Sequence, residues 1–265
     1  MFATALAQAP KNEIKLFVAD AKVDEAKKRV QEEFPTGTPP PKKHQIYFFD
    51  TKSLELYGNT SGPVILRARQ KEGKKPQSTV KVRRDKRDPD LEKKLADISS
   101  ELEIETESIA GKKGPPGISY ALDAKPGKEL SELDNAGSDK IAGWFSDKQR
   151  EFLEAAGVKV DWEKLKVFGR IEADVWEWQE QDKRVDAEVT AELWRLGTRQ
   201  VFELSCKKPG GNAAQQLDSF VAFFKDHHIL AVENPDSKTK QALDHFGSNT
   251  RPSPRPATTT TPAGP

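Results

Sequence analysis

The sequence has a single cysteine, Cys206, among 265 residues. One cysteine excludes an internal disulfide and any zinc site built from several cysteines. No stretch approaches the roughly 18 consecutive apolar residues that a membrane-spanning helix requires. The chain also lacks a large net charge of either sign, because 43 lysines and arginines nearly balance 42 aspartates and glutamates and leave +1. Composition therefore indicates no general attraction to DNA or to an acidic membrane.

Aromatic and charged residues are plentiful. A hydrophobic content of 35% with 32% charged residues is low for a globular protein, but five Trp and thirteen Phe argue against global disorder. The length suits one large domain or two small ones. We expect one domain over 11–246, with a loop or helix insertion at about 108–160. The segment 247–265, rich in Pro and Thr, is expected to be a disordered tail.

The first ten residues have some features of an export signal. Ala7 and Ala9 precede Pro10 in the pattern of a signal-peptidase cleavage site, but a basic region and a full apolar core are missing. Residues 1–10 are therefore either the remnant of a longer signal peptide, which would place the protein in the periplasm or outside the cell, or the leader of a cytoplasmic protein.

Charged and apolar residues alternate in two neighbouring runs, 65–69 and 79–83. Side chains two positions apart in a strand share a face, so both runs present their cations on one side: Arg67, Arg69, Lys81 and Arg83. Four cations on adjacent strands repel one another and require acids, water or a polyanion opposite them. The pattern thus predicts a face that binds an anion.

The same alternation predicts most of the remaining secondary structure. Further strands are expected at 11–18, 45–51, 101–105, 166–178, 184–193 and 200–207. Helices are expected at 20–34, 91–96, 146–157, 212–228 and 236–246, from their N-cap residues and the helical spacing of apolar side chains. Gly, Pro and Lys dominate 111–139, which we expect to be a loop.

Strands with one charged and one apolar face fit two architectures. A β-sandwich would bury the apolar faces and leave the charged faces in water. A closed barrel would direct the charges inward and cover its apolar exterior with amphipathic helices. The order of the charges favours the barrel, because cations concentrate in the first half of the chain and acids in the second. A site that binds a polyphosphate with its metal ion requires such segregation.

Several short motifs, in this order, resemble the CYTH domain of the triphosphate tunnel metalloenzymes. They are Glu13 with Lys15, the stretches 47–51 and 66–69, Thr79 with Lys81, the acidic run 101–105, and the late strand that contains Glu203. The resemblance covers about 11–230. It implies an α+β, β-dominated fold: a closed antiparallel eight-stranded tunnel barrel with amphipathic helices packed outside.

The resemblance also implies a ligand and an activity. The ligand would be a small molecule containing triphosphate or polyphosphate, and the protein would be a phosphohydrolase (a triphosphatase) that requires Mg²⁺ or Mn²⁺. The implied phosphate-binding residues are Lys15, Arg67, Arg69, Lys81, Arg83 and Arg170. The implied metal ligands are Glu13, Glu203, Glu103 and Glu192. Glu13, Glu203 and Lys15 would be catalytic. Guanidinium forks suit phosphate oxygens, and hard divalent ions take carboxylate oxygens.

Two positions depart from the family pattern. Lys11 stands where the first strand of the family has a Glu, and Ser205 replaces the second Glu of the late strand. A single metal ion is therefore an alternative to two. Three functions stay open: a metal-dependent phosphohydrolase, a domain that binds polyphosphate without turnover, and a structural envelope domain whose tunnel holds only ion pairs. Either a monomer or a homodimer fits, and we expect neither a nucleic-acid partner nor a transmembrane segment.

Overall fold

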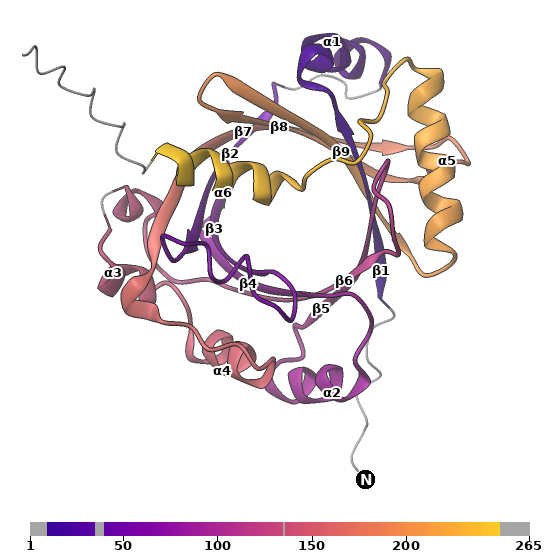
Figure 1. Cartoon of the computed structure of the whole chain (residues 1–265). Coiled ribbons are helices and arrows are strands. Elements are labelled where there is room, and N and C mark those ends of the chain that lie inside the picture. Colours follow the sequence, from indigo (N-terminus) through magenta and orange to yellow (C-terminus); the bar gives the residue numbers. More distant parts are fainter. Residues whose placement is uncertain (1–9, 35–39, 135, 250–265) are drawn as a thin grey trace, which may run out of the picture.

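The computed structural model describes residues 10–34, 40–134 and 136–249. Within them, nine strands close into one barrel in the spatial order β1-β5-β6-β4-β3-β2-β7-β8-β9 (Figure 1). Their bounds are β1 Lys11–Val18, β2 Lys42–Asp50, β3 Val64–Lys71, β4 Gln77–Arg84, β5 Glu103–Ile109, β6 Gly117–Ala124, β7 Lys166–Glu180, β8 Ala187–Leu196 and β9 Arg199–Pro209. The closed, β-dominated barrel predicted from the charge order is confirmed.

The prediction of eight antiparallel strands was wrong in two respects. The ninth strand is β6, which lies in the segment expected to be a loop and pairs antiparallel with both β4 and β5. Moreover, β5 pairs parallel with β1, so the barrel is mixed. The strand β6 was not predicted because Gly, Pro and Lys residues surround it, and the composition of the whole segment is therefore typical of a loop.

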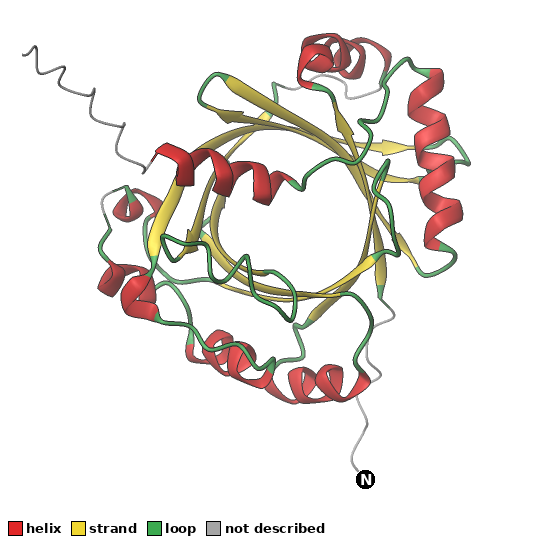
Figure 2. Cartoon of the chain, in the orientation of Figure 1, coloured by secondary structure: helices red, strands yellow, loops and turns green. Residues whose placement is uncertain are grey.

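Helices cover the outside of the barrel (Figure 2). The α-helices are α1 Val23–Glu33, α2 Pro89–Ile98, α3 Ser138–Ala142, α4 Asp147–Ala155, α5 Ala213–Asp226 and α6 Lys238–Asn249, and the 3-10 helices are η1 Asp20–Lys22, η2 Leu130–Leu133 and η3 Trp162–Lys164. Helices α1 and α5 bury apolar side chains against outward residues such as Leu16 and Phe202. Helices α2, α3 and α4 do the same against Leu66 and Val80. Most apolar side chains of these strands therefore point outward and are shielded from water, which leaves the charged side chains for the interior.

Helix α4 is fixed to the barrel by a residue of its predicted capping box. Ser146 Oγ accepts from the Gln149 backbone N–H at 3.3 Å. The buried Gln149 side chain donates in turn to the backbone oxygens of Ser78 and Leu122, at 3.2 and 2.9 Å. It thus satisfies one backbone carbonyl on β4 and one on β6 and holds the helix against both strands.

Helix α6 lies across one end of the barrel rather than along its side (Figure 1). Its residues Ala242 and Leu243 are buried in a cluster with Phe17, Phe48 and Trp194 of the barrel strands. These contacts close that end of the barrel with apolar side chains.

The terminal predictions concern 1–9 and 250–265, which lie outside the described residues; α6 itself continues to Asn249, past the predicted start of the tail. Within the predicted insertion at about 108–160, β6 belongs to the barrel, while η2, α3 and α4 lie outside it. No helix in the described part of the chain is long and apolar enough to cross a membrane.

Candidate functional site

The inner face of the barrel surrounds a cavity of about 620 Å³. All but one of the residues predicted for the site line it: Glu13, Lys15, Arg67, Arg69, Lys81, Arg83, Glu103, Glu192 and Glu203. They converge because each lies on the inward-pointing positions of its strand, two residues apart. In the barrel order, the basic strands β3 and β4 lie across the cavity from β8, β9 and β1, which contribute most of the predicted carboxylates.

Lys15 on β1 lies between two carboxylates. Its Nζ is 2.9 Å from Glu13 Oε2 and 2.5 Å from Glu107 Oε1. Glu107 also pairs with Arg83 at 3.0 Å. Burial raises the pKa of Glu107, but Lys15 and Arg83 outweigh burial and bring this pKa to about 2. The same contacts raise the pKa of Lys15 above its ordinary range in spite of burial.

Glu105 on β5 forms a second paired group. Its carboxylate lies 3.0 Å from Lys81 Nζ and 2.5 Å from Lys207 Nζ. Burial opposes ionisation of Glu105, yet Lys81 and Lys207 lower its pKa below the ordinary value. Lys81, expected to bind phosphate, is thus partly neutralised by Glu105.

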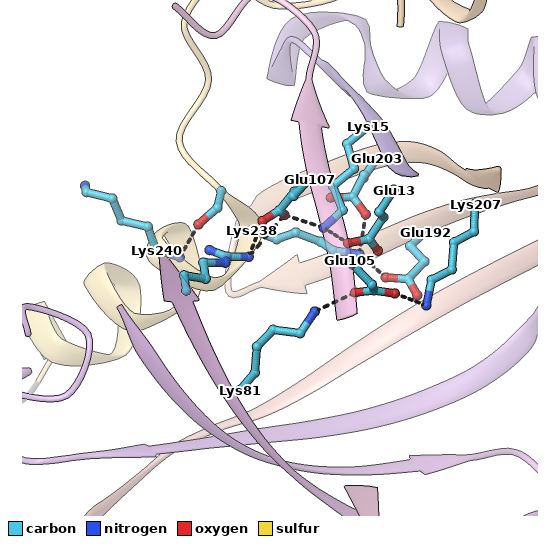
Figure 3. Close-up of polar contacts among 12 residues, drawn as sticks. Glu13, Lys15, Lys81, Glu105, Glu107, Glu192, Glu203, Lys207, Lys238 and Lys240 are labelled. Atoms are coloured by element: carbon cyan, nitrogen blue, oxygen red, sulfur yellow. Dashed lines mark hydrogen bonds and ion pairs between the residues drawn. The ribbon is translucent and has the colours of Figure 1, made fainter. Parts of the chain in front are cut away.

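A third group connects Lys238 of α6 with carboxylates on β8 and β9 (Figure 3). The Lys238 ammonium pairs with Glu192, lies 2.7 Å from Glu203 Oε1, and stands 4.8 Å from the centre of the Trp194 ring. Burial works against the charge on Glu192, but Lys238 lowers its pKa to about 2. For Glu203 burial prevails, and its pKa is raised despite Lys238 and Lys15. The two carboxylates therefore share one cation.

Three cations on β3 are different, because Arg67, Arg69 and Lys71 form no ion pair with any residue that the structure describes. Arg67 donates to Thr79 Oγ1 at 3.0 Å, and the buried Nε atoms of Arg67 and Arg69 have no hydrogen-bond partner among the described residues. Burial, followed by repulsion from Arg69, lowers the pKa of Arg67 to about 10. Nearby, burial lowers the pKa of His44 to about 4, so its imidazole is neutral at pH 7. Arg67, Arg69 and Lys71 thus form a part of the cavity in which the cations have no carboxylate in direct contact.

Arg170 was predicted for the site, and the structure places it elsewhere. It does not line the cavity; its side chain is 42% exposed, and its guanidinium lies 3.4 Å from Glu172. The register between β2 and β7 shifts between Ile46 and Phe48, which leaves Gly169 and Arg170 as an irregularity in the strand. Such a bulge reverses the alternation on which the prediction relied.

Several residues that line the cavity were not in the predicted set. Glu107 and Lys71 continue the alternation of β5 and β3 by one further step, so extending those strands would have included them. Lys207 lies on the predicted inner face of β9. For Lys238 no pattern in the sequence indicated that its helix would cross the barrel opening.

The predicted metal ligands do not fit a divalent ion in this arrangement. No group of three or more His, Cys, Asp or Glu side chains in the described ranges is placed to hold a metal. Glu13 is paired with Lys15, while Glu192 and Glu203 are paired with Lys238. Mg²⁺ and Mn²⁺ need carboxylate oxygens that are free of such cations. The metal-binding assignment therefore stays a prediction that the geometry does not support.

The fold and its interior define a class: a closed β-barrel with a charged tunnel and helices outside. Solved structures share this fold. One is a candidate adenylyl cyclase from Hippeastrum, described as having a dominant triphosphatase activity, with a TM-score of 0.59 and 14% identity over 88% of this chain and 95% of the other. Another is a candidate adenylate cyclase from Bacillus halodurans, with a TM-score of 0.52 and 11% identity over 89% and 98%. No protein-family model and no curated protein matches the sequence.

Proposed function

We propose that the protein binds the triphosphate or polyphosphate group of an inorganic or organic small molecule inside its barrel. The observation that carries this proposal is the absence of a carboxylate partner for Arg67, Arg69 and Lys71 among the described residues. Every other charge cluster of the cavity that we describe above pairs each cation with an acid.

The three cations of β3 without an ion pair are of the right sign for this ligand. A tripolyphosphate carries about four negative charges near neutral pH, and guanidinium groups bind phosphate oxygens through paired hydrogen bonds. Cations without a counter-charge in a partly buried site are unfavourable, so an anion that enters supplies what the protein lacks. The cavity volume of about 620 Å³ is ordinary for a small-molecule site.

The comparisons support the same ligand class. The closed barrel with helices outside agrees with the general architecture that the CYTH-like motifs imply, and the Hippeastrum protein that shares the fold is described as having triphosphatase activity. Membership of the triphosphate tunnel metalloenzymes is accordingly part of the proposal. A structural domain whose tunnel holds only ion pairs is less favoured, because it leaves the β3 cations unexplained.

A more specific form of the proposal is that the protein also hydrolyses the bound triphosphate or polyphosphate. It rests on Glu13, Lys15 and Glu203, which occupy positions matching the motifs of the family. Since the carboxylates do not fit a metal ion, binding is better supported than metal-dependent turnover.

Ligand-induced thermal stabilisation tests the binding proposal. Tripolyphosphate at millimolar concentration should raise the unfolding temperature of the wild type, and orthophosphate should do so much less. Arg69→Met should weaken tripolyphosphate binding about 10-fold or more, because charge-assisted hydrogen bonds are lost. Arg170→Met is the matched control, since it removes an exposed arginine outside the cavity, and it should bind like the wild type. Absence of any shift with tripolyphosphate would refute the proposal.

A phosphate-release assay on the same samples, with Mg²⁺ or Mn²⁺ added, separates the finer alternatives. Release that is lost in Glu203→Ala supports a phosphohydrolase in which this carboxylate takes part. Stabilisation without release supports a domain that binds polyphosphate without turnover.

A further inference from the structure

Helix α6 places a lysine inside the barrel, between two carboxylates expected to bind metal. Glu192 and Glu203 are direct cross-strand partners on β8 and β9, so their side chains lie next to one another. The Lys238 ammonium pairs with both, and only 15% of the Lys238 side chain is exposed. Figure 3 shows this lysine reaching the carboxylates from the segment that closes the barrel end.

We propose that Lys238 is a tethered counter-cation that excludes divalent metal ions from the Glu192–Glu203 pair. As a consequence of this exclusion, the cavity binds polyphosphate without a divalent metal ion. The consequence rests on the proposed function, whereas the exclusion itself can be tested without any phosphate ligand.

Two adjacent buried carboxylates repel each other and need a cation between them. A divalent ion would meet that need, but it would have to approach the Lys238 ammonium, which already lies there and repels it. The ammonium also donates a hydrogen bond to Glu192 and lies 2.7 Å from Glu203 Oε1, so it occupies one oxygen of each carboxylate that a metal would require. Lysine and metal are therefore alternatives for the same pair.

Lys238 is held in place by more than its charge. Next to it, Ser237 Oγ lies 3.2 Å from the Tyr57 hydroxyl, and Leu243 is buried further along the helix. The ammonium stands over the Trp194 ring, which favours a cation there. Because the helix is anchored to the barrel, the lysine is always present at the carboxylates, unlike an ion from solution.

The same replacement recurs elsewhere in the cavity. Lys15 binds Glu13, which the sequence also predicted as a metal ligand. Lys207 binds Glu105, which lies on β5, the strand next to β1 in the barrel. Lysines thus pair with Glu13, Glu105, Glu192 and Glu203 on the acidic side of the cavity, which is consistent with a site that faces its ligand with protein cations.

Titration of metal-free protein with Mn²⁺, followed by the loss of the free Mn²⁺ electron paramagnetic resonance signal, tests the exclusion. Wild type should bind no Mn²⁺ below millimolar concentration. Lys238→Met should gain a site at least about tenfold tighter, and Lys238→Met combined with Glu192→Gln should lose it. Lys240→Met is the matched control, since the Lys240 ammonium pairs with Asp236 and Asp244 instead; it should behave like the wild type.

Wild type that binds Mn²⁺ as tightly as Lys238→Met would overturn the proposal, as would folded Lys238→Met that gains no site. If Lys238→Met does not fold, Lys238→Gln, which keeps a hydrogen-bond donor, replaces it. As a second measurement, tripolyphosphate should bind the wild type in EDTA, and excess Mg²⁺ should not tighten binding. A requirement for Mg²⁺ would overturn the consequence, whereas no tripolyphosphate binding under any condition refutes the proposed function and leaves the Mn²⁺ result readable.

Discussion

Replacement of Arg67 by Met should make the unliganded protein more stable while it weakens ligand binding. Burial and Arg69 lower the pKa of Arg67 from 12.5 to about 10. At pH 7, below both values, the guanidinium is charged in the folded and unfolded states, so the full penalty applies. A difference of about 2.5 pKa units corresponds to about 3 kcal/mol. Loss of the hydrogen bond to Thr79 offsets about 1 kcal/mol, which leaves a net gain of about 2 kcal/mol.

Urea unfolding at pH 7 measures this gain. Arg83→Met is the matched control, because Arg83 lies 3.0 Å from Glu107, and its removal leaves that buried carboxylate with Lys15 alone. We expect Arg83→Met to be destabilised by about 1–3 kcal/mol. With tripolyphosphate present, Arg67→Met should lose about 1.5–3 kcal/mol of binding free energy, roughly 10-fold to 150-fold in Kd.

Arg67→Met is expected to increase the free energy of unfolding and Arg83→Met to decrease it, so the two variants can be told apart in one experiment. An Arg67→Met variant that is less stable than the wild type, by an amount similar to Arg83→Met, would show that Arg67 has a favourable partner in the free protein. Undiminished tripolyphosphate affinity in Arg67→Met would show that this arginine does not bind the ligand.

Two further predictions concern acid stability and the backbone. Glu107 and Glu192 have pKa values of about 2, below the ordinary 4.5, so their stabilising contribution is complete above about pH 4.5 and disappears as the pH falls towards 2. Urea midpoints measured from pH 6 to pH 2 should fall in this window, and more gently in Glu107→Gln; an unchanged slope in that variant would contradict the assignment. Gly62→Ala should cost about 2–4 kcal/mol, because φ is +114° and the new Cβ would lie 2.2 Å from the Arg83 backbone oxygen. Gly73→Ala, at positive φ with open space around it, should cost only about 1–2 kcal/mol by the same measurement, and equal losses would rule out the steric argument.

Alternation of side chains predicted the barrel wall well, since each inward residue is fixed by its neighbours two positions away. Arg67 and Arg69 were correctly placed on one face of β3. Lys71 lies on the same face, but the predicted strand ended before it. Arg170 shows the limit of this reasoning. A bulge in β7 changes the face of every residue beyond it, and alternation alone does not locate it; the local sign of this bulge is Gly169, a glycine inside the strand at a φ of +142°.

The position of α6 could not be predicted in this way. Its apolar residues, Ala242 and Leu243, indicate a helix with one buried face, but they do not specify which surface covers that face. Packing across the barrel end is a tertiary contact between segments far apart in sequence. Lys238 consequently reaches Glu192 and Glu203 by a route that neither strand nor helix periodicity encodes.

The place of β1 in the barrel has a consequence for synthesis. One edge of β1 pairs with β9, and the Asn12 side chain donates to the backbone oxygen of Gly210, 198 residues later. At about 5–20 residues per second, a ribosome needs roughly 10–40 s to make that interval, and this edge stays open meanwhile. Open edges recruit other chains, and charged side chains on the strand discourage such pairing. Lys11, Glu13 and Lys15, which line the finished cavity, are such charged side chains on β1.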